Sequence, residues 1–207
     1  MNKIIEKEYL TDTTVKLVFD APEITKESKA GHFVFVHLND EERSVLSIAD
    51  TNTDAGTITL VVEAVGDTST KLAGLSEGDE LKIEGPKGKE IAIEQFGTVL
   101  AIAGAAGIAS MLMTVKELKT AGNKVMSILV AQTEEQMFFE ADIMEYSDEL
   151  TIFTYDNGDK NGLSALIEEV LSKENISKAF LMGPRTLLSA ANDVIKGRNI
   201  AVQSTLW

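Results

Sequence analysis

The sequence contains no cysteine and only two histidines, His32 and His37. Disulfides, thiolate zinc sites, cysteine nucleophiles and thiolate-held iron–sulfur clusters all require cysteine, so the chain can form none of them. Two histidines are also too few for a histidine-rich metal site. We therefore expect no metal centre.

The chain also lacks a long apolar run and an excess of positive charge. No stretch approaches the roughly 20 residues that a membrane-spanning helix needs, and residues 1–8 are too charged for a signal peptide. The formal net charge of −14 at pH 7 is unsuited to nucleic acid and to anionic membrane surfaces. We expect a cytoplasmic protein with no nucleic-acid partner and no membrane insertion.

The composition is typical of a folded globular protein: of the 207 residues, 44% are hydrophobic and 25% are charged. This length suits one large domain or two modest ones, and the pattern changes near Phe96. Residues 1–96 alternate apolar and polar positions over short strands, which is typical of an antiparallel β-barrel or sandwich. Residues 97–207 alternate strands with helices, which indicates an α/β domain with a parallel sheet. We predict two domains, 1–96 and 97–207.

Several segments carry these predictions. In the first domain we expect strands at 14–19, 31–38, 57–62 and 79–84, a hairpin turn at 55–56 and a helical turn at 69–75. In the second we expect strands at 98–103, 124–130, 150–154, 178–182 and 199–203, with helices ending near 121 and spanning 163–171 and 185–195.

Two glycine turns follow strands of the second domain. One is Gly104-Ala105-Ala106-Gly107 with Ile108 behind it, and the other is Gly183-Pro184. A turn of this kind directs unpaired backbone N–H groups and the positive end of a helix dipole toward an anion. Both turns fall on the carboxyl edge of the sheet, where ligands bind in open parallel sheets. The alternative is a tight packing turn that binds nothing.

The end of the second strand of this domain bears on nucleotide selectivity. Residues 131–135, which include Gln132, contain two glutamates and no lysine or arginine. A 2′-phosphate would find no positive partner there, and this favours NAD over NADP.

The first domain offers two further anion-binding candidates. Arg43 lies just before a small apolar strand, where its guanidinium can hold a pyrophosphate through paired hydrogen bonds. Arg43, Val45 and Ser47 point to one side of that strand, and residues 44, 46 and 48 point to the other. Residues 66–72 place hydroxyl and N–H groups at an expected helix start. The alternatives are a solvated arginine on an edge strand and helix capping alone.

These segments resemble the ferredoxin-NADP reductase superfamily over nearly the whole chain. Residues 43–50 are similar to the Arg-x-Pro-Leu-Thr-Ile-Ala-Asp motif of the small FAD- and NAD-binding subunits of NADH-dependent ferredoxin-NADP oxidoreductase and sulfide dehydrogenase, with Val45 in place of the proline. Dihydroorotate dehydrogenase electron-transfer subunits are more distant members of the same group. Residues 66–72 resemble the Gly-x-x-Thr-x-x-Leu segment of the group, and residues 84–89 resemble its Gly-Pro-x-Gly turn.

The second domain departs further from the pattern of the group. Ala103 and Ala105 replace glycines, Ser110 replaces a proline, and Met182 replaces a cysteine that lies near the nicotinamide. Residues 156–158 resemble an Asp-Asp-Gly segment near the nucleotide. The cysteine-rich tail that binds an iron–sulfur cluster in the subgroup has no counterpart here, so the resemblance implies that this cluster is absent.

The resemblance implies which residues contact each cofactor. FAD would be held by Arg43, Val45, Leu46, Ser47, Ile48, Gly66, Thr68, Ser69, Thr70, Gly85 and Pro86. NAD(H) would be held by Gly104, Ala105, Ala106, Gly107, Ile108, Gln132, Asp156, Gly183 and Pro184. Some flavin reductases of the superfamily end in an aromatic residue that stacks on the isoalloxazine, and Trp207 either does this or fills the domain interface.

We therefore predict a flavoprotein oxidoreductase that moves electrons between NAD(P)H, with NADH favoured, and an acceptor protein or larger subunit by way of FAD. Ser47 is the expected catalytic residue, as the hydrogen-bonding partner that tunes the flavin N5. The alternative is a noncatalytic FAD-binding or assembly subunit whose altered nucleotide turn no longer binds NADH. A plain scaffold with neither cofactor fits the 43–50 segment least well.

Overall fold

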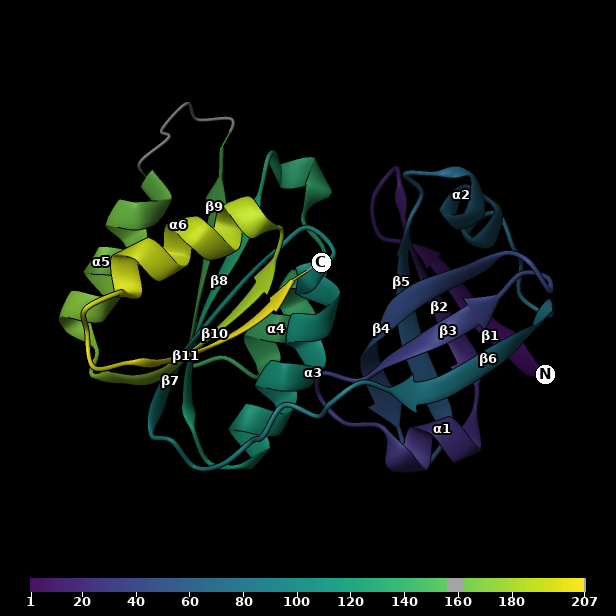
Figure 1. The fold of residues 1–207 in the computed structure, drawn as a ribbon, viewed down its shortest axis with the longest axis horizontal. Helices are drawn as coiled ribbons and strands as arrows, with labels where there is room; N and C mark the ends of the chain where they lie inside the picture. Colours follow the sequence, from purple (N-terminus) through teal and green to yellow (C-terminus); the bar gives the residue numbers. More distant parts are fainter. Residues whose placement is uncertain (156–161, 207) are drawn as a thin grey trace. The chain divides into compact units, whose positions relative to one another are not determined.

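The computed structural model describes residues 1–155 and 162–206. The chain divides into two compact units, Met1–Ile91 and Ala92–Trp207. The division falls in the segment between the last strand of the first unit and the first strand of the second (Figure 1). No helix in the described ranges is long and apolar enough to cross a membrane.

The first unit is a closed six-stranded barrel in which every neighbouring pair is antiparallel. Around the barrel the strands follow the order β1-β2-β5-β4-β3-β6. The elements are β1 (Asn2–Tyr9), β2 (Thr14–Asp20), α1 (Pro22–Glu27), β3 (Phe33–His37), β4 (Arg43–Asn52), β5 (Thr57–Glu63), α2 (Asp67–Ala73) and β6 (Glu80–Lys87). The antiparallel barrel expected from the sequence is confirmed.

Alternating apolar residues build the barrel core. Leu17 and Phe19 of β2 and Ile58 and Leu60 of β5 are fully buried, whereas the residues between them on each strand are more exposed. Burying each of these side chains stabilises the fold by about 1.5–3 kcal/mol. The period of two that predicts these strands is therefore also what closes the barrel around its core.

The second unit is a five-stranded parallel sheet in the order β11-β10-β7-β8-β9. Its elements are β7 (Thr98–Gly104), α3 (Gly107–Thr120), β8 (Lys124–Ala131), the 3-10 turn η1 (Glu134–Gln136), α4 (Glu140–Glu145), β9 (Glu149–Thr154), α5 (Gly162–Lys173), β10 (Ile176–Gly183), α6 (Arg185–Ile195) and β11 (Ala201–Leu206). The expected α/β architecture is confirmed. The direction of travel through the sheet reverses between β7 and β10.

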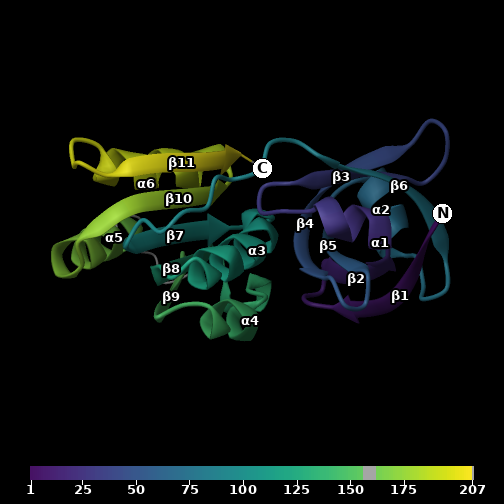
Figure 2. The same ribbon diagram turned by 90° about the horizontal axis from the view of Figure 1, so that it is seen from below.

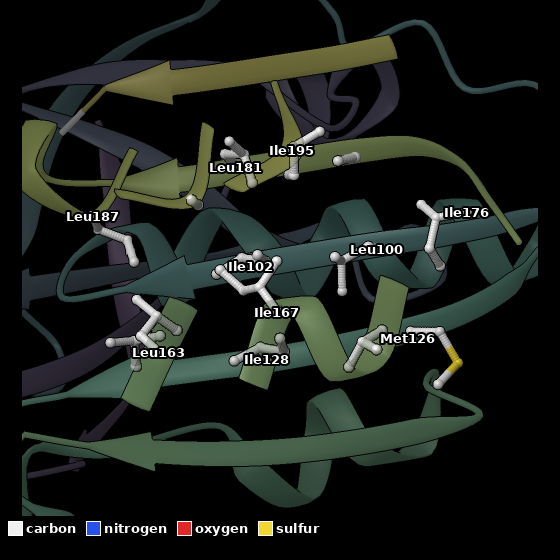
Figure 3. Close-up of a cluster of buried hydrophobic side chains, with 14 residues drawn as sticks. Leu100, Ile102, Met126, Ile128, Leu163, Ile167, Ile176, Leu181, Leu187 and Ile195 are labelled. Atoms are coloured by element: carbon white, nitrogen blue, oxygen red, sulfur yellow. The ribbon is translucent and has the colours of Figure 1, made fainter. Parts of the chain in front are cut away.

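Helices cover both faces of this sheet. Helices α3 and α4 contact one another, as do α5 and α6, and the two pairs lie on opposite faces (Figure 2). On the α5–α6 face, Leu163 and Ile167 of α5 and Leu187 of α6 meet Ile102 of β7 and Ile128 of β8 in a buried cluster (Figure 3). The central strands β7, β8 and β10 are therefore buried on both faces, and ligands of such sheets bind at the strand ends.

The ends of several elements lie one to three residues from their expected positions. The last strand is Ala201–Leu206 rather than 199–203. Pro184 is the residue that caps α6, and the helix spans Arg185–Ile195 as expected. Pro184 has φ −67° and an extended ψ of 153°, so its fixed ring geometry suits the cap position as well.

Candidate functional site

Six side chains of β3 and β4 share the outer surface of the barrel. Directly opposed residues of an antiparallel pair lie on the same face, and the register pairs Arg43 with His37, Val45 with Phe35 and Ser47 with Phe33. Val34 and Val36, which alternate with these residues on β3, are fully buried in the barrel. The expected alternation of β4 is confirmed. We call this surface the β3–β4 face: Phe33, Phe35, His37, Arg43, Val45 and Ser47.

Arg43 lies exposed at one end of this face. Its guanidinium carbon is 4.4 Å from the centroid of the Phe35 ring. The guanidinium makes no hydrogen bond or ion pair with any other described residue. A contact with a ring leaves the N–H donors of the guanidinium unused. Arg43 is therefore available to an anionic ligand, as its expected role requires.

Ser47 lies at the other end of the face and is 8% exposed. Its Oγ is buried and has no hydrogen-bond partner in the described part of the chain. A buried hydroxyl left unpaired costs about 1–3 kcal/mol, so such groups in folded proteins generally meet a ligand or an ordered water. An unpaired hydroxyl at one end of this face and an unpaired guanidinium at the other fit an elongated ligand with a polar ring system and a phosphate, as FAD has.

The remaining expected residues of β4 differ in what they can contribute. Val45 is 52% exposed on the β3–β4 face. Leu46 pairs with Val34 and points toward the barrel interior, and Ile48 is 1% exposed opposite Leu60 of β5. The side chain of Ile48 belongs to the core, so only its backbone is available to a cofactor.

Helix α2 begins at the second expected anion site. The Ser69 Oγ accepts hydrogen bonds from the backbone N–H groups of Gly66 (3.0 Å) and Val65 (3.2 Å). Ser69 therefore caps the helix, which was the alternative interpretation for this segment. Thr68 is half-buried and Thr70 is exposed. Their hydroxyl groups remain the candidates for binding a ligand.

Gly85 and Pro86 lie within β6, next to β3. A Cβ added to Gly85 would stand 2.7 Å from Val34 Cγ1 and 3.2 Å from the carbonyl oxygen of Phe33. A Cβ on Gly88, where φ is +90°, would stand 2.8 Å from the Phe33 ring. These glycines let β6 pack closely against β3, and they thereby fix Phe33 on the β3–β4 face.

The two glycine turns of the second unit meet at the carboxyl edge of the sheet. A Cβ on Gly183 would stand 2.8 Å from the carbonyl oxygen of Gly104, and a Cβ on Gly107 would stand 2.4 Å from that of Met182. The turns follow β7 and β10, the strands between which the topology reverses. This is the position where ligands bind in open α/β sheets. The glycines themselves are explained by contact between the two chain segments.

The first of these turns carries an unusual backbone conformation. Ala105 has φ +51°, a left-handed conformation that glycine adopts more readily. Ala105 and Ala106 are exposed, while the Ile108 side chain is fully buried. The first turn of the 14-residue helix α3 has no side-chain cap from Ala106. The Ile108 N–H donates to the Ala105 carbonyl oxygen at 3.0 Å, and the other N–H groups of the first turn, with the positive end of the helix dipole, face the carboxyl edge.

The sequence analysis missed four polar or aromatic groups near these sites. Three of them, Phe33, Phe35 and His37, join the β3–β4 face only through the pairing of β3 with β4. The Ser110 Oγ on α3 is buried without a hydrogen-bond partner among the described residues. Strand pairing is not visible in one sequence. For Ser110, the sequence signal that pointed to the residue is that it replaces a proline of the family motif.

The remaining expected residues lie at the end of β8 or outside the described ranges. The backbone N–H of Gln132 donates to Oε1 of Gln136 at 3.3 Å, and Glu134 and Glu135 are exposed in the following 3-10 turn. The expected ribose end therefore carries negative charge. Asp156 and Trp207 lie outside the described residues.

Comparisons with known proteins agree with this geometry. The family described as an oxidoreductase FAD-binding domain matches residues 2–91. The electron transfer subunit homolog of dihydroorotate dehydrogenase B (NAD(+)) from Thermotoga maritima is 30% identical over 98% of this chain and 72% of its own length. The corresponding electron transfer subunit of Bacillus velezensis is 26% identical over 87% of this chain and 73% of its own.

A solved structure shares both units. A chain of the NADH-dependent reduced ferredoxin-NADP oxidoreductase, studied for flavin-based electron bifurcation, superposes with a TM-score of 0.91 at 26% identity, covering 100% of this chain and 76% of the other. The chain belongs to the family of the dihydroorotate dehydrogenase B electron-transfer subunits and their homologues, within the FAD-binding, ferredoxin-reductase-like superfamily.

Proposed function

We propose that this chain is an FAD-containing electron-transfer subunit that accepts a hydride from NADH and passes electrons to a partner protein. The observation that carries the proposal is the β3–β4 face, where a buried, unpaired Ser47 hydroxyl and an unpaired Arg43 guanidinium lie on one side of one strand. FAD, when bound, supplies the two-electron and one-electron chemistry that protein side chains lack.

The residues of the barrel then have separate tasks. Arg43 binds the pyrophosphate through its N–H donors, because a guanidinium matches the geometry of phosphate oxygens. Ser47 hydrogen bonds to the flavin ring and so orients it and tunes N5. Thr68 and Thr70 at the start of α2 add hydroxyl donors. These tasks are binding and orientation, which is what a protein contributes to cofactor chemistry.

The carboxyl edge of the second unit is the proposed NADH site. The N–H groups at the start of α3 suit a pyrophosphate, and the topological reversal between β7 and β10 lies beside them. Glu134 and Glu135 at the end of β8 would repel a 2′-phosphate, which favours NADH over NADPH.

The names of the relatives support a protein acceptor. The Thermotoga maritima and Bacillus velezensis proteins are named as electron transfer subunits of dihydroorotate dehydrogenase B, or a homolog of one, and a subunit implies a partner subunit. The solved relative belongs to an NADH-dependent ferredoxin-NADP oxidoreductase. We place this chain with the small subunits of such complexes.

One feature favours a second function, that of an FAD-binding subunit without NADH-dependent turnover. Ala105 puts a methyl group in a left-handed turn at the proposed dinucleotide site. The close contact between the two glycine turns accounts for Gly104, Gly107 and Gly183 without a ligand. Met182, where the family has a cysteine, is 1% exposed. A chain with this edge could retain FAD and lose NADH.

Anaerobic titration separates the two functions. The purified full chain, reconstituted with FAD, should show a flavin absorbance that NADH bleaches. A flavin absorbance that dithionite bleaches and NADH does not would establish the noncatalytic function. A chain that does not take up FAD would refute both.

A substitution tests the role of Arg43. Arg43→Ala should weaken FAD binding by about 10- to 100-fold, because hydrogen bonds to charged groups contribute about 1.5–3 kcal/mol. Arg43→Lys should recover part of the loss. Lys26→Ala, which removes a surface cation paired with Glu23 on α1, is the matched control and should bind FAD like the wild type. Equal FAD affinity of Arg43→Ala and the wild type would disprove the assignment.

A further inference from the structure

The β3–β4 face contains a contact that the proposed FAD site does not require, and we propose that it sets the affinity of that site. Phe35 is a positioning residue: its ring holds the Arg43 guanidinium in place before the phosphate arrives and leaves the N–H donors free. This inference rests on the proposed binding of FAD phosphate by Arg43. It adds a residue that the sequence motif does not contain.

The geometry of the pair is that of a cation–π contact. Phe35 stands directly opposite Val45, so Arg43 is its diagonal neighbour on β4. The 4.4 Å between the guanidinium carbon and the ring centroid lies within the roughly 6 Å at which such contacts are attractive. Arginine stacks on aromatic rings through its planar face, and its donors lie in the plane of the guanidinium. The ring therefore orients the group without consuming a donor.

A carboxylate at the same position would act in the opposite way, because it would take two donors in a bidentate pair. Glu84 of β6 stands opposite Phe35, but it is engaged elsewhere. Its carboxylate is 3.2 Å from Lys87 Nζ and 3.6 Å from His37 Nε2. The hydrogen bond from Lys87 is the main cause that lowers the pKa of Glu84. Arg43 thus has a ring for a neighbour and keeps its charge uncompensated.

The ring is itself held in place. Phe35 contacts Phe33 edge-to-face, with the centroids 5.6 Å apart and the planes at 85°. Its strand, β3, is paired on both sides, with β4 and with β6. A rigid platform restricts the rotamers of the long arginine side chain before binding, so less conformational entropy is lost when a ligand arrives. Preorganisation of this kind raises affinity without adding a contact to the ligand.

A double-mutant cycle on the full chain tests the inference. The variants are Phe35→Leu, Arg43→Ala and the pair together, and the measurement is the FAD dissociation constant of the apoprotein by flavin fluorescence. Phe35→Leu should weaken FAD binding about 2- to 5-fold, the effect expected for an exposed cation–π contact. In the Arg43→Ala background the same change should have no effect. Phe35→Tyr keeps the ring face and should restore wild-type affinity.

Two controls keep the result interpretable. Phe35→Met has a similar volume without a ring and should reproduce the Phe35→Leu effect, and thermal unfolding of each apoprotein shows whether the fold persists. Lys26→Ala, the surface control on α1, should leave FAD affinity unchanged with and without Arg43. An equal loss from Phe35→Leu in both backgrounds would overturn the positioning role, as would no loss at all.

The cycle also distinguishes this inference from the function on which it rests. If Arg43→Ala alone leaves FAD affinity unchanged, the proposed phosphate contact fails. If Arg43→Ala weakens binding and Phe35→Leu does not, only the positioning role fails.

Discussion

Substitution of Gly107 by alanine should destabilise the unit Ala92–Trp207 in the absence of any ligand. The added Cβ would stand 2.4 Å from the carbonyl oxygen of Met182, 2.5 Å from its carbonyl carbon and 2.7 Å from the backbone nitrogen of Gly183. These atoms belong to β10, which is paired on both sides by β7 and β11. They cannot rotate away, so helix α3 or the strand must move.

The size of the effect follows from two opposing terms. Overpacking a close contact costs about 1–3 kcal/mol, and more where backbone must shift. Alanine is favoured over glycine in a helix by about 1 kcal/mol at most. Because backbone must shift here, the cost lies near 3 kcal/mol and the net loss is about 2 kcal/mol, which lowers Tm by roughly 8 °C for a unit of this size.

Thermal unfolding followed by circular dichroism measures this loss, and Gly122→Ala provides the comparison within the same unit. Gly122 has φ +84° and its nearest neighbour is the flexible Gln95 side chain at 3.3 Å. Its substitution should cost only about 1 kcal/mol of backbone strain. If Gly107→Ala is as stable as the wild type and only loses NADH affinity, the glycine is reserved for the ligand, and our packing argument is wrong.

Three further outcomes are expected. Ser47→Ala removes a buried unpaired hydroxyl, so the apoprotein should gain about 1 kcal/mol of stability while the rise in Tm caused by FAD becomes smaller; a less stable apoprotein would contradict this. Ala105→Gly relieves the left-handed conformation and should raise Tm by a few degrees, about 0.5–1 kcal/mol, and a lower Tm would argue against strain. The hydrogen bond from Lys119, followed by that from the Val125 N–H, lowers the pKa of Asp148 below its usual value of 3.8. Because the folded-state pKa is the lower one, this stabilisation is present above about pH 4 and lost as pH falls through the folded-state pKa. Between pH 5 and pH 3 (about the range of this titration), Tm should therefore fall less steeply for Asp148→Asn than for the wild type, and parallel curves would show that the carboxylate contributes nothing.

The parts of the fold that the sequence predicts are those with strong periodicity. Strands β2 and β5 alternate clearly, and β7 and β8 are mainly apolar, so their types and positions are confirmed. Strand β1 is not predicted, because half of its residues are charged and only Ile4 is fully buried. Helices α1 and α4 have six residues each and are too short to show a helical period.

The site could be predicted only in part, for a related reason. The alternation of Arg43, Val45 and Ser47 follows from the period of a single strand. The contact of Arg43 with Phe35 depends on the register between β3 and β4, which one sequence does not specify. The glycine turns were placed correctly on the same edge of the sheet. Their close contact with one another depends on the crossing of β10 beside β7, which local patterns cannot reveal.

The strand order also determines how this edge is built as the chain folds. Ala101 of β7 pairs with Ser127 of β8 on one side and with Phe180 of β10 on the other. The pairing of β7 with β8 closes a short loop. The pairing of β7 with β10 closes a longer loop that contains β8, β9 and α5, and it therefore costs more chain entropy. The two glycine turns at the proposed dinucleotide site therefore come together late in folding. A nascent chain that has not yet reached Ile176 contains the turn after β7 and lacks the turn after β10.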